Sequence, residues 1–243
     1  MIPRPIVILT IVFVGSLAWN KYEEPSQFRL ACHELSLAMQ APFTKRSPFF
    51  LKPPRKHIDG GSFVIKKLDG GNASALCKAY SPNSMALFAA PGESMLTPDR
   101  MNFYSKFLLL EQKYGRRLVY IGFDKKTSRP LGMIEFGSHP NPEAGQVAGW
   151  LNEASWGTGI AKEGLAKAFH AFFESTGAQE VEGLVHEENM RCLAFLRKNH
   201  FHENGARLVR GSRMRVFTLP WAKLAELNLP KPRTAATLVA CEN

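Results

Sequence analysis

The sequence lacks the features that define several classes of protein. Its four cysteines, Cys32, Cys77, Cys192 and Cys241, are widely and irregularly spaced, and no Cys-x-x-Cys pair or Cys/His cluster occurs. Neither a disulfide framework nor a structural zinc site is therefore expected. The seven histidines are equally scattered, so we expect no metal.

Long basic runs are also absent. The net charge is +10, yet no five Lys or Arg residues stand in a row, and no basic stripe alternates with aromatic residues. Nucleic acid is therefore not favoured over an anionic membrane surface or an acidic small molecule such as a nucleotide diphosphate. A basic solvated surface explains the charge equally well. The hydrophobic fraction of 45% and the aromatic fraction of 11% indicate a folded core rather than wholesale disorder.

One long apolar run occurs, at the N-terminus. Residues 6–19 are almost wholly apolar, with Arg4 before them and Lys21 after them. The run is shorter than the ~20 residues that span a bilayer and fits the apolar part of a signal peptide. Cleavage after Ala18 suits the small residues there but not the bulky Trp19, and a short uncleaved anchor or a buried core helix are alternatives. Through residues 1–19 we expect a membrane-associated or secreted protein, or a cytoplasmic one if the start is mis-assigned.

Residues 20–61 are expected to form a helix and a linker. Residues 28–39 have apolar side chains at helical spacing, which predicts one amphipathic helix. Four prolines between residues 42 and 54, mixed with Lys and Arg, then interrupt regular structure. This basic segment reads as a solvated linker, and contact with anionic headgroups is the alternative.

Residues 62–220 have the pattern of one α/β (α+β) domain, followed by a tail at 221–243. Periodicity and helix caps predict strands at 62–68, 117–123, 131–136, 146–151, 181–185 and 214–219, and helices at 73–80, 97–114, 162–175, 189–198 and 221–227. The polar segment 124–130 predicts an antiparallel hairpin. The strand–helix–strand unit over 146–185 leaves no room for a hairpin, so it predicts a parallel pair.

A glycine loop joins that strand to its helix. Gly157 and Gly159 precede the helix that continues through residues 162–175. Backbone N–H groups at such a helix N-terminus can bind phosphate oxygens, and glycine permits the close approach. A plain strand-to-helix turn also uses glycine, so the loop alone is weak evidence. The third glycine of a dinucleotide-binding fingerprint is absent, and an antiparallel meander precedes the loop, so a Rossmann site is disfavoured.

Two motifs together carry a family resemblance. The segment Gly149–Leu165, GWLNEASWGTGIAKEGL, resembles motif A of the GNAT superfamily of N-acetyltransferases. It is most similar to the branch that acetylates the N-terminal serine or alanine of ribosomal proteins. The segment Val185–Phe201, VHEENMRCLAFLRKNHF, resembles the second signature of the family, with Cys192 at the usual Ser/Ala position and His200 in place of a glycine. The resemblance extends over roughly residues 62 to 220.

The resemblance implies a fold and a cofactor site. The fold is a mixed central sheet with an antiparallel N-terminal meander, a V-shaped split between the central strands, and helices on both faces. Acetyl-CoA, the co-substrate, would lie in the split, with its pantetheine arm on the backbone of Leu151 and Asn152. Asn189 would lie near the arm and the thioester. The N–H groups implied for the pyrophosphate are those of Trp156, Gly157, Thr158, Gly159, Ile160 and Ala161.

The reaction implied is direct attack of an amine on the thioester, with a base for the amine and an acid for the leaving thiolate. The tyrosine that many family members use as the acid is replaced by Leu196. Cys192 is the candidate in its place, through its S–H group, beside Asn189; a small buried helix residue is the alternative for Cys192. For the base we consider Glu135, Glu153 and His186, each of which can equally be an ordinary polar residue at a strand end.

Two functions remain open on the sequence alone. The first is an N-acetyltransferase that acts on a primary amine of a protein N-terminus, a peptide or a small molecule. The second is a degenerate GNAT module that binds acyl-CoA or a partner without turnover. The intact loop Trp156–Ala161 favours the enzyme, whereas Leu196, Cys192 and His200 favour the module. An export signal would also conflict with acetyl-CoA, which is chiefly an intracellular metabolite.

Overall fold

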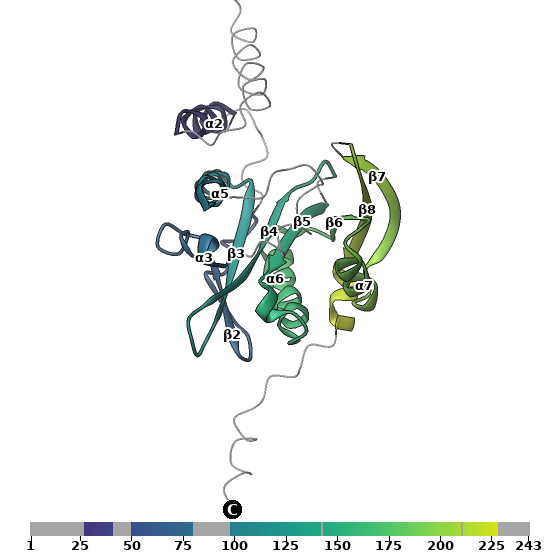
Figure 1. Ribbon diagram of the computed structural model, residues 1–243. Helices are drawn as coiled ribbons and strands as arrows, with labels where there is room; N and C mark the ends of the chain where they lie inside the picture. Colours follow the sequence, from purple (N-terminus) through teal and green to yellow (C-terminus); the bar gives the residue numbers. More distant parts are fainter. Residues whose placement is uncertain (1–26, 41–49, 80–97, 142, 210, 228–243) are drawn as a thin grey trace, which may run out of the picture.

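The fold is one eight-stranded sheet with helices on both faces (Figure 1). The computed structural model describes residues 27–40, 50–79, 98–141, 143–209 and 211–227. The strands are β1 (His57–Asp59), β2 (Phe63–Lys67), β3 (Arg117–Asp124), β4 (Pro130–Ser138), β5 (Ala144–Leu151), β6 (Glu180–His186), β7 (His202–Val209) and β8 (Ser212–Pro220). The helices are α2 (Gln27–Gln40), α3 (Ala75–Ala79), α5 (Pro98–Lys113), α6 (Ile160–Thr176) and α7 (Met190–Lys198), with 3-10 turns η1 (Glu153–Ser155) and η2 (Trp221–Leu227).

The sheet has the order β1–β2–β3–β4–β5–β6–β8–β7. Every neighbouring pair is antiparallel except β5 and β6, which are parallel. The predicted mixed sheet, its antiparallel meander and its parallel central pair are therefore confirmed. Residue 97, where the helix predicted over 97–114 begins, and the tail beyond residue 227 lie outside the described residues.

Two hydrophobic cores lie on opposite faces of the sheet, because successive side chains of a strand point to opposite sides. On β3, Leu118 and Tyr120 belong to the core under α6 and α7, whereas Val119 and Ile121 belong to the core under α3 and α5. The same alternation on β4 places Ile134 with α6. Figure 1 shows the helices on the two sides of the strands.

Helix α6 packs on strands β4 and β5 through Phe172. Phe172 stacks on Phe136 of β4, with ring centroids 4.4 Å apart. The contact needs a glycine at position 145, because a Cβ there would lie 2.3 Å from the Phe172 ring. The helix ends within one residue of its predicted end at 175, and Gly177, which follows it, has φ 70° and donates its N–H to the carbonyl of Phe173.

Helix α2, predicted over 28–39, is confirmed and lies against α5. His33 Nε2 lies 2.7 Å from a carboxylate oxygen of Glu111, and Lys113 lies 2.6 Å from Glu34. Leu30 and Leu37 of α2 are also buried, and the ring of His33 stacks on Phe107, so both apolar and polar contacts hold α2 on the described domain.

Two edge strands were not predicted. Strand β1 has three residues, of which only Ile58 is buried, and prolines and glycines flank it. Strand β7 is exposed over most of its length, and its register shifts between Glu203 and Ala206. Both lack the apolar alternation on which strand prediction depends, because neither edge strand buries a complete face.

The expectation of a membrane-associated or secreted protein is corrected. Among the helices of the described residues, none is both long enough and apolar enough to cross a membrane. The apolar run at 6–19, on which the expectation rested, lies outside those residues.

Candidate functional site

The central strands part at the place where the cavity opens. Strands β5 and β6 pair only from Ala144 opposite Glu180 to Val147 opposite Gly183, although both strands continue beyond these residues. The unpaired part of β5, the loop that follows it, α6 and the start of α7 line a cavity of about 690 Å³. The volume is within the range of sites for small ligands, about 300–1,000 Å³.

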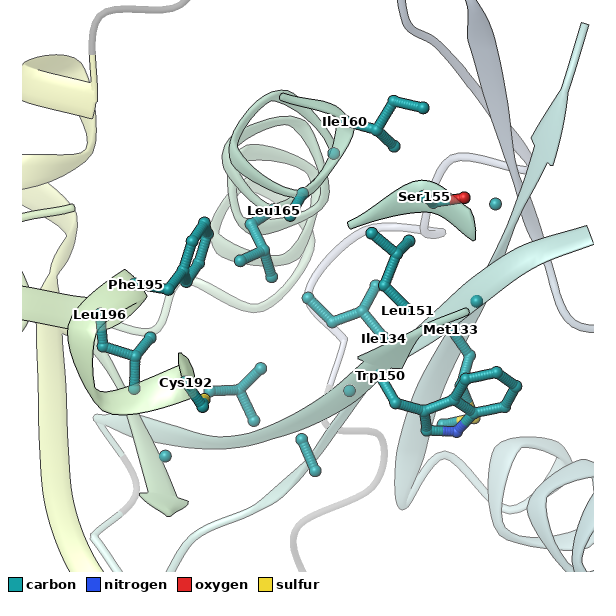
Figure 2. Close-up of a pocket in the computed structure, with 18 of the residues that line it drawn as sticks. Met133, Ile134, Trp150, Leu151, Ser155, Ile160, Leu165, Cys192, Phe195 and Leu196 are labelled. Carbon is teal, nitrogen blue, oxygen red and sulfur yellow. The ribbon is translucent and has the colours of Figure 1, made fainter. Parts of the chain in front are cut away.

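Figure 2 shows how the apolar lining residues meet between the helices and the sheet. Leu165 of α6 points toward Ile134 and Leu151 of the sheet, and Phe195 of α7 lies beside Leu165. These side chains form an apolar wall along the cavity, so it favours the apolar parts of a bound ligand.

The glycine loop presents unpaired backbone donors at one end of this cavity. Gly157 and Gly159 have φ of 76° and 83°, a conformation that L side chains rarely adopt, and a Cβ at either position would meet nothing within 4 Å. Of the N–H groups implied for the pyrophosphate, that of Trp156 is already engaged, because it donates to the carbonyl of Glu153. Those of residues 157–161 donate no hydrogen bond within the described chain. Together with the positive end of α6, they form a site that fits phosphate oxygens.

The turn that holds the loop is fixed by side-chain hydrogen bonds. Asn152 donates from Nδ2 to the carbonyl of Pro130 and accepts from the hydroxyl of Ser155. Trp156 donates its indole N–H to the carbonyl of Leu151, over 2.9 Å. These bonds tie the end of β5 to the loop, so the free N–H groups are oriented before a ligand arrives.

The backbone groups predicted to hold the pantetheine arm are partly engaged already. The N–H of Asn152 donates to the carbonyl of Leu131, and the carbonyl of Leu151 accepts from Trp156. A carbonyl oxygen has a second lone pair. Hydrogen bonding of an arm at this position would therefore use the remaining acceptor capacity of the two carbonyls or the unpaired edge of β5.

Three predicted catalytic candidates lie together where β6 leads into α7. His186, Asn189 and Cys192 all line the cavity. The Asn189 side chain accepts from the N–H of Cys192 and caps α7, and His186 Nδ1 accepts from the N–H of Glu188 over 3.3 Å. With Nδ1 as acceptor, a neutral imidazole carries its proton on Nε2.

Cys192 remains protonated at neutral pH. Burial raises the pKa of its thiol to about 11, so the thiolate that nucleophilic attack requires is scarce. The same pKa makes the group a weaker acid than an ordinary thiol, whose pKa is about 8.5. Cys192 can therefore donate a hydrogen bond to a leaving sulfur, whereas complete proton transfer would be uphill.

Glu135 lies elsewhere, on the face of the sheet under α5. Its carboxylate receives hydrogen bonds from Arg117 and from the hydroxyl of Tyr104, each over 2.9 Å. Burial raises its pKa, against the opposing effects of Arg117 and Tyr104. Neither Glu135 nor the exposed Glu153 is among the described residues that line the cavity.

Sequence reasoning missed part of the site. The apolar wall of Ile134, Leu165 and Phe195 was not identified, because apolar residues at these spacings look like ordinary core. Arg191, which also lines the cavity, was missed although it lies inside the second motif. Within the described residues no three His, Cys, Asp or Glu side chains gather closely enough to hold a metal ion.

Known protein structures share the fold of this chain. A ribosomal-protein-S5-alanine acetyltransferase from Vibrio fischeri has TM-score 0.55 and 13% identity, over 68% of this chain and 96% of its own. Mycobacterium smegmatis RimJ in complex with CoA-disulfide has TM-score 0.55 and 19% identity, over 73% and 88%. A Salmonella typhimurium acetyltransferase that modifies the N-terminal serine of ribosomal protein L7/L12 has TM-score 0.57 and 17% identity, over 66% and 96%. At these identities the likeness shows the fold.

Sequence comparison supplies the family. No curated protein matches the sequence. The family profile described as "Acetyltransferase (GNAT) domain" matches residues 68–202, which is more than half of the chain and contains both motifs. The resemblance drawn from those motifs is confirmed, and the chain belongs to the GNAT family of acetyltransferases.

Proposed function

We propose that the cavity binds acetyl-CoA and that the chain transfers the acetyl group to a primary amine by direct attack in a ternary complex. The observation that carries the proposal is the row of unpaired N–H groups from Gly157 to Ala161, at the open end of the β5–β6 split. These N–H groups fit the diphosphate of acetyl-CoA, and the apolar wall beside them fits its pantetheine arm.

The acceptor that we favour is a protein N-terminus. Two of the structural relatives are described as acting on an N-terminal serine or an alanine of a ribosomal protein. A peptide or small-molecule amine uses the same chemistry, because each offers a primary amine that attacks when it is neutral. The substrate panel in the experiment below separates these acceptors.

Within the site, Asn189 positions the first turn of α7, and Cys192 donates a hydrogen bond to the leaving sulfur. His186 is our candidate for the base, because it lines the cavity. It can accept a proton at Nδ1 only by releasing the N–H of Glu188, which binds over 3.3 Å. Glu135 is already occupied by Arg117 and Tyr104, so its role as a base would require that pair to open.

The test has two steps. Binding of acetyl-CoA to the full chain is measured by calorimetry, and release of free CoA is then followed with a panel of N-terminal peptides, polyamines and small amines. Labelled acetyl-CoA and mass spectrometry locate the modified amine. No binding would refute the proposal, whereas binding without release over every amine would identify a module without turnover.

A further inference from the structure

The glycine loop that precedes α6 has no positively charged side chain of its own. Residues 156–161 read WGTGIA, so the loop offers only backbone N–H groups and the partial charge of a helix end. A diphosphate brings full negative charges into this site. A cation from another part of the chain would complete it.

Arg191 is the cation that the fold brings to this loop. Its guanidinium lies 4.1 Å from the centre of the Trp156 ring, and both residues line the cavity. The indole is itself fixed by its hydrogen bond to Leu151. A residue of α7 is thereby stacked on the loop before α6, across the opening of the split.

The stacking leaves the hydrogen-bonding capacity of Arg191 unused. Six arginines of the described chain pair with carboxylates: Arg55, Arg117, Arg197, Arg207, Arg213 and Arg215. Among the described residues, Arg191 has no carboxylate within ion-pair distance. A guanidinium on an aromatic face is held through its π surface, so its five N–H donors remain available in the plane.

The position of Arg191 is unfavourable for the helix alone. It is the second residue of α7, near the positive end of the helix dipole, where a cation destabilises. An anion bound nearby would reverse the sign of this interaction. The location therefore suits a ligand better than it suits the stability of the helix.

We propose that Arg191, oriented by stacking on Trp156, binds the diphosphate of a CoA thioester together with the free N–H groups of residues 157–161. The inference rests on the proposed function, and it assigns to α7 a positioning role toward the diphosphate. Planar guanidinium forks bind phosphate oxygens in pairs, which a lysine does not reproduce.

The test compares three probes that differ in their phosphates. CoA carries the diphosphate and a 3′-phosphate, dephospho-CoA carries the diphosphate alone, and pantetheine carries neither. Calorimetry on the full chain should show that Arg191→Gln weakens CoA and dephospho-CoA by about tenfold to a hundredfold, the loss expected for a charge-assisted hydrogen bond. Binding of pantetheine should not change.

Matched variants sharpen this result. Arg197→Gln, on the same helix but paired with Glu203, should leave all three affinities unchanged. Trp156→Leu removes the stacking surface and should lower CoA affinity more than Trp156→Phe. Without ligand, Arg191→Gln loses both an unfavourable charge at the start of α7 and the contact with Trp156. Since the two effects oppose each other, its melting temperature should change little, whereas a purely structural role would lower it.

Several outcomes would overturn the assignment. These are an unchanged affinity for CoA, an equal loss with pantetheine, or a loss with CoA that dephospho-CoA does not share. The last outcome would place Arg191 on the 3′-phosphate. If wild type binds neither nucleotide probe, the proposed function itself fails; if wild type binds both and Arg191→Gln binds them equally, only the role of Arg191 fails.

Discussion

The two faces of the sheet treat polar groups in opposite ways. Under α5, His33, Tyr104, Glu111, Arg117 and Glu135 form a chain of contacts in which each carboxylate has a charged partner, while Arg117 Nε, 3.6 Å from Glu111, makes no hydrogen bond to any described residue. Around the split, the loop N–H groups and the guanidinium of Arg191 have no polar partner in the described chain. Polar groups that are satisfied hold helices in place, and polar groups left open indicate where a ligand fits.

The largest effect on stability is expected from a change that removes a charged partner from the network under α5. Arg117→Met leaves Glu111 and Glu135 buried without their shared cation, so the free energy of unfolding should fall by about 3–5 kcal/mol. Denaturant titration measures the fall, and CoA affinity at a temperature where the variant is folded should stay unchanged. A fall in CoA affinity would show that the two faces are coupled. As a control, Glu135→Gln keeps turnover unless Glu135 is the base.

Changes in the glycine loop at the split should affect ligand binding more than stability. Gly159→Ala forces a side chain into the left-handed region and reorients the donors, so CoA affinity should fall by about a hundredfold. The matched control is Gly205→Ala in β7, where φ is 91° and a Cβ is equally unobstructed. Both variants should lose similar stability, of about 1 kcal/mol. Equal CoA affinities in the two variants would contradict the phosphate-loop assignment.

Acid titration should show that Glu111 and Glu135, both under α5, change the free energy of unfolding in opposite directions as the pH falls. Burial raises the pKa of Glu111, but the hydrogen bond from His33 and the charge of Arg117 together lower it by more. The net shift is therefore downward from 4.5. Its ionised form therefore stabilises the fold above that value, and the contribution is lost as the pH falls through the folded pKa. Glu111→Gln should accordingly reduce the loss of stability in acid.

In the same titration, the contribution of Glu135 to stability should change in the opposite direction to that of Glu111. Because burial raises its pKa, its ionised form is penalised, and protonation relieves the penalty as the pH falls. Glu135→Gln removes this relief and should make the decline in acid steeper. Unfolding free energies measured from pH ~6 to pH ~3 test both variants. Parallel curves for the two would refute this division.

The smallest effect is expected at Cys192. With a thiol pKa of about 11, alkylation near pH ~8 should label the exposed Cys32 well before Cys192. Mass spectrometry of digested protein measures the order. Cys192→Ser keeps a hydrogen-bond donor and should lower kcat by less than about tenfold, with Cys32→Ser as the control. Rapid labelling of Cys192 at neutral pH would argue for a nucleophilic role instead.

Much of the fold could be predicted because it obeys local periodicity. The helix over 162–175 and the hairpin of β3 and β4 each follow from the spacing of apolar and polar side chains within or beside the element itself. Strands β1 and β7 could not be predicted, because hydrogen bonds to a neighbour define an edge strand and its own sequence carries no alternation.

The residues of the site also fall into two groups, those that local sequence marks and those that only tertiary contacts bring together. The loop Trp156–Ala161 could be located because glycine spacing marks it. The stacking of Arg191 on Trp156 joins residues that are 35 positions apart, and no local pattern encodes such a meeting. The pairing of Glu135 with Arg117 and Tyr104 depends likewise on tertiary contacts, which is why a strand glutamate could be mistaken for a free base.

The short register between β5 and β6 has a mechanical consequence. Only four residue pairs join the meander β1–β5 to the remainder of the sheet, β6, β8 and β7. A ligand that fills the split would contact both parts of the sheet. It would thereby supply contacts that a longer pairing of β5 and β6 would otherwise make. Saturation with a tight ligand should then slow hydrogen exchange on both sides of the junction, far beyond the residues that the ligand touches.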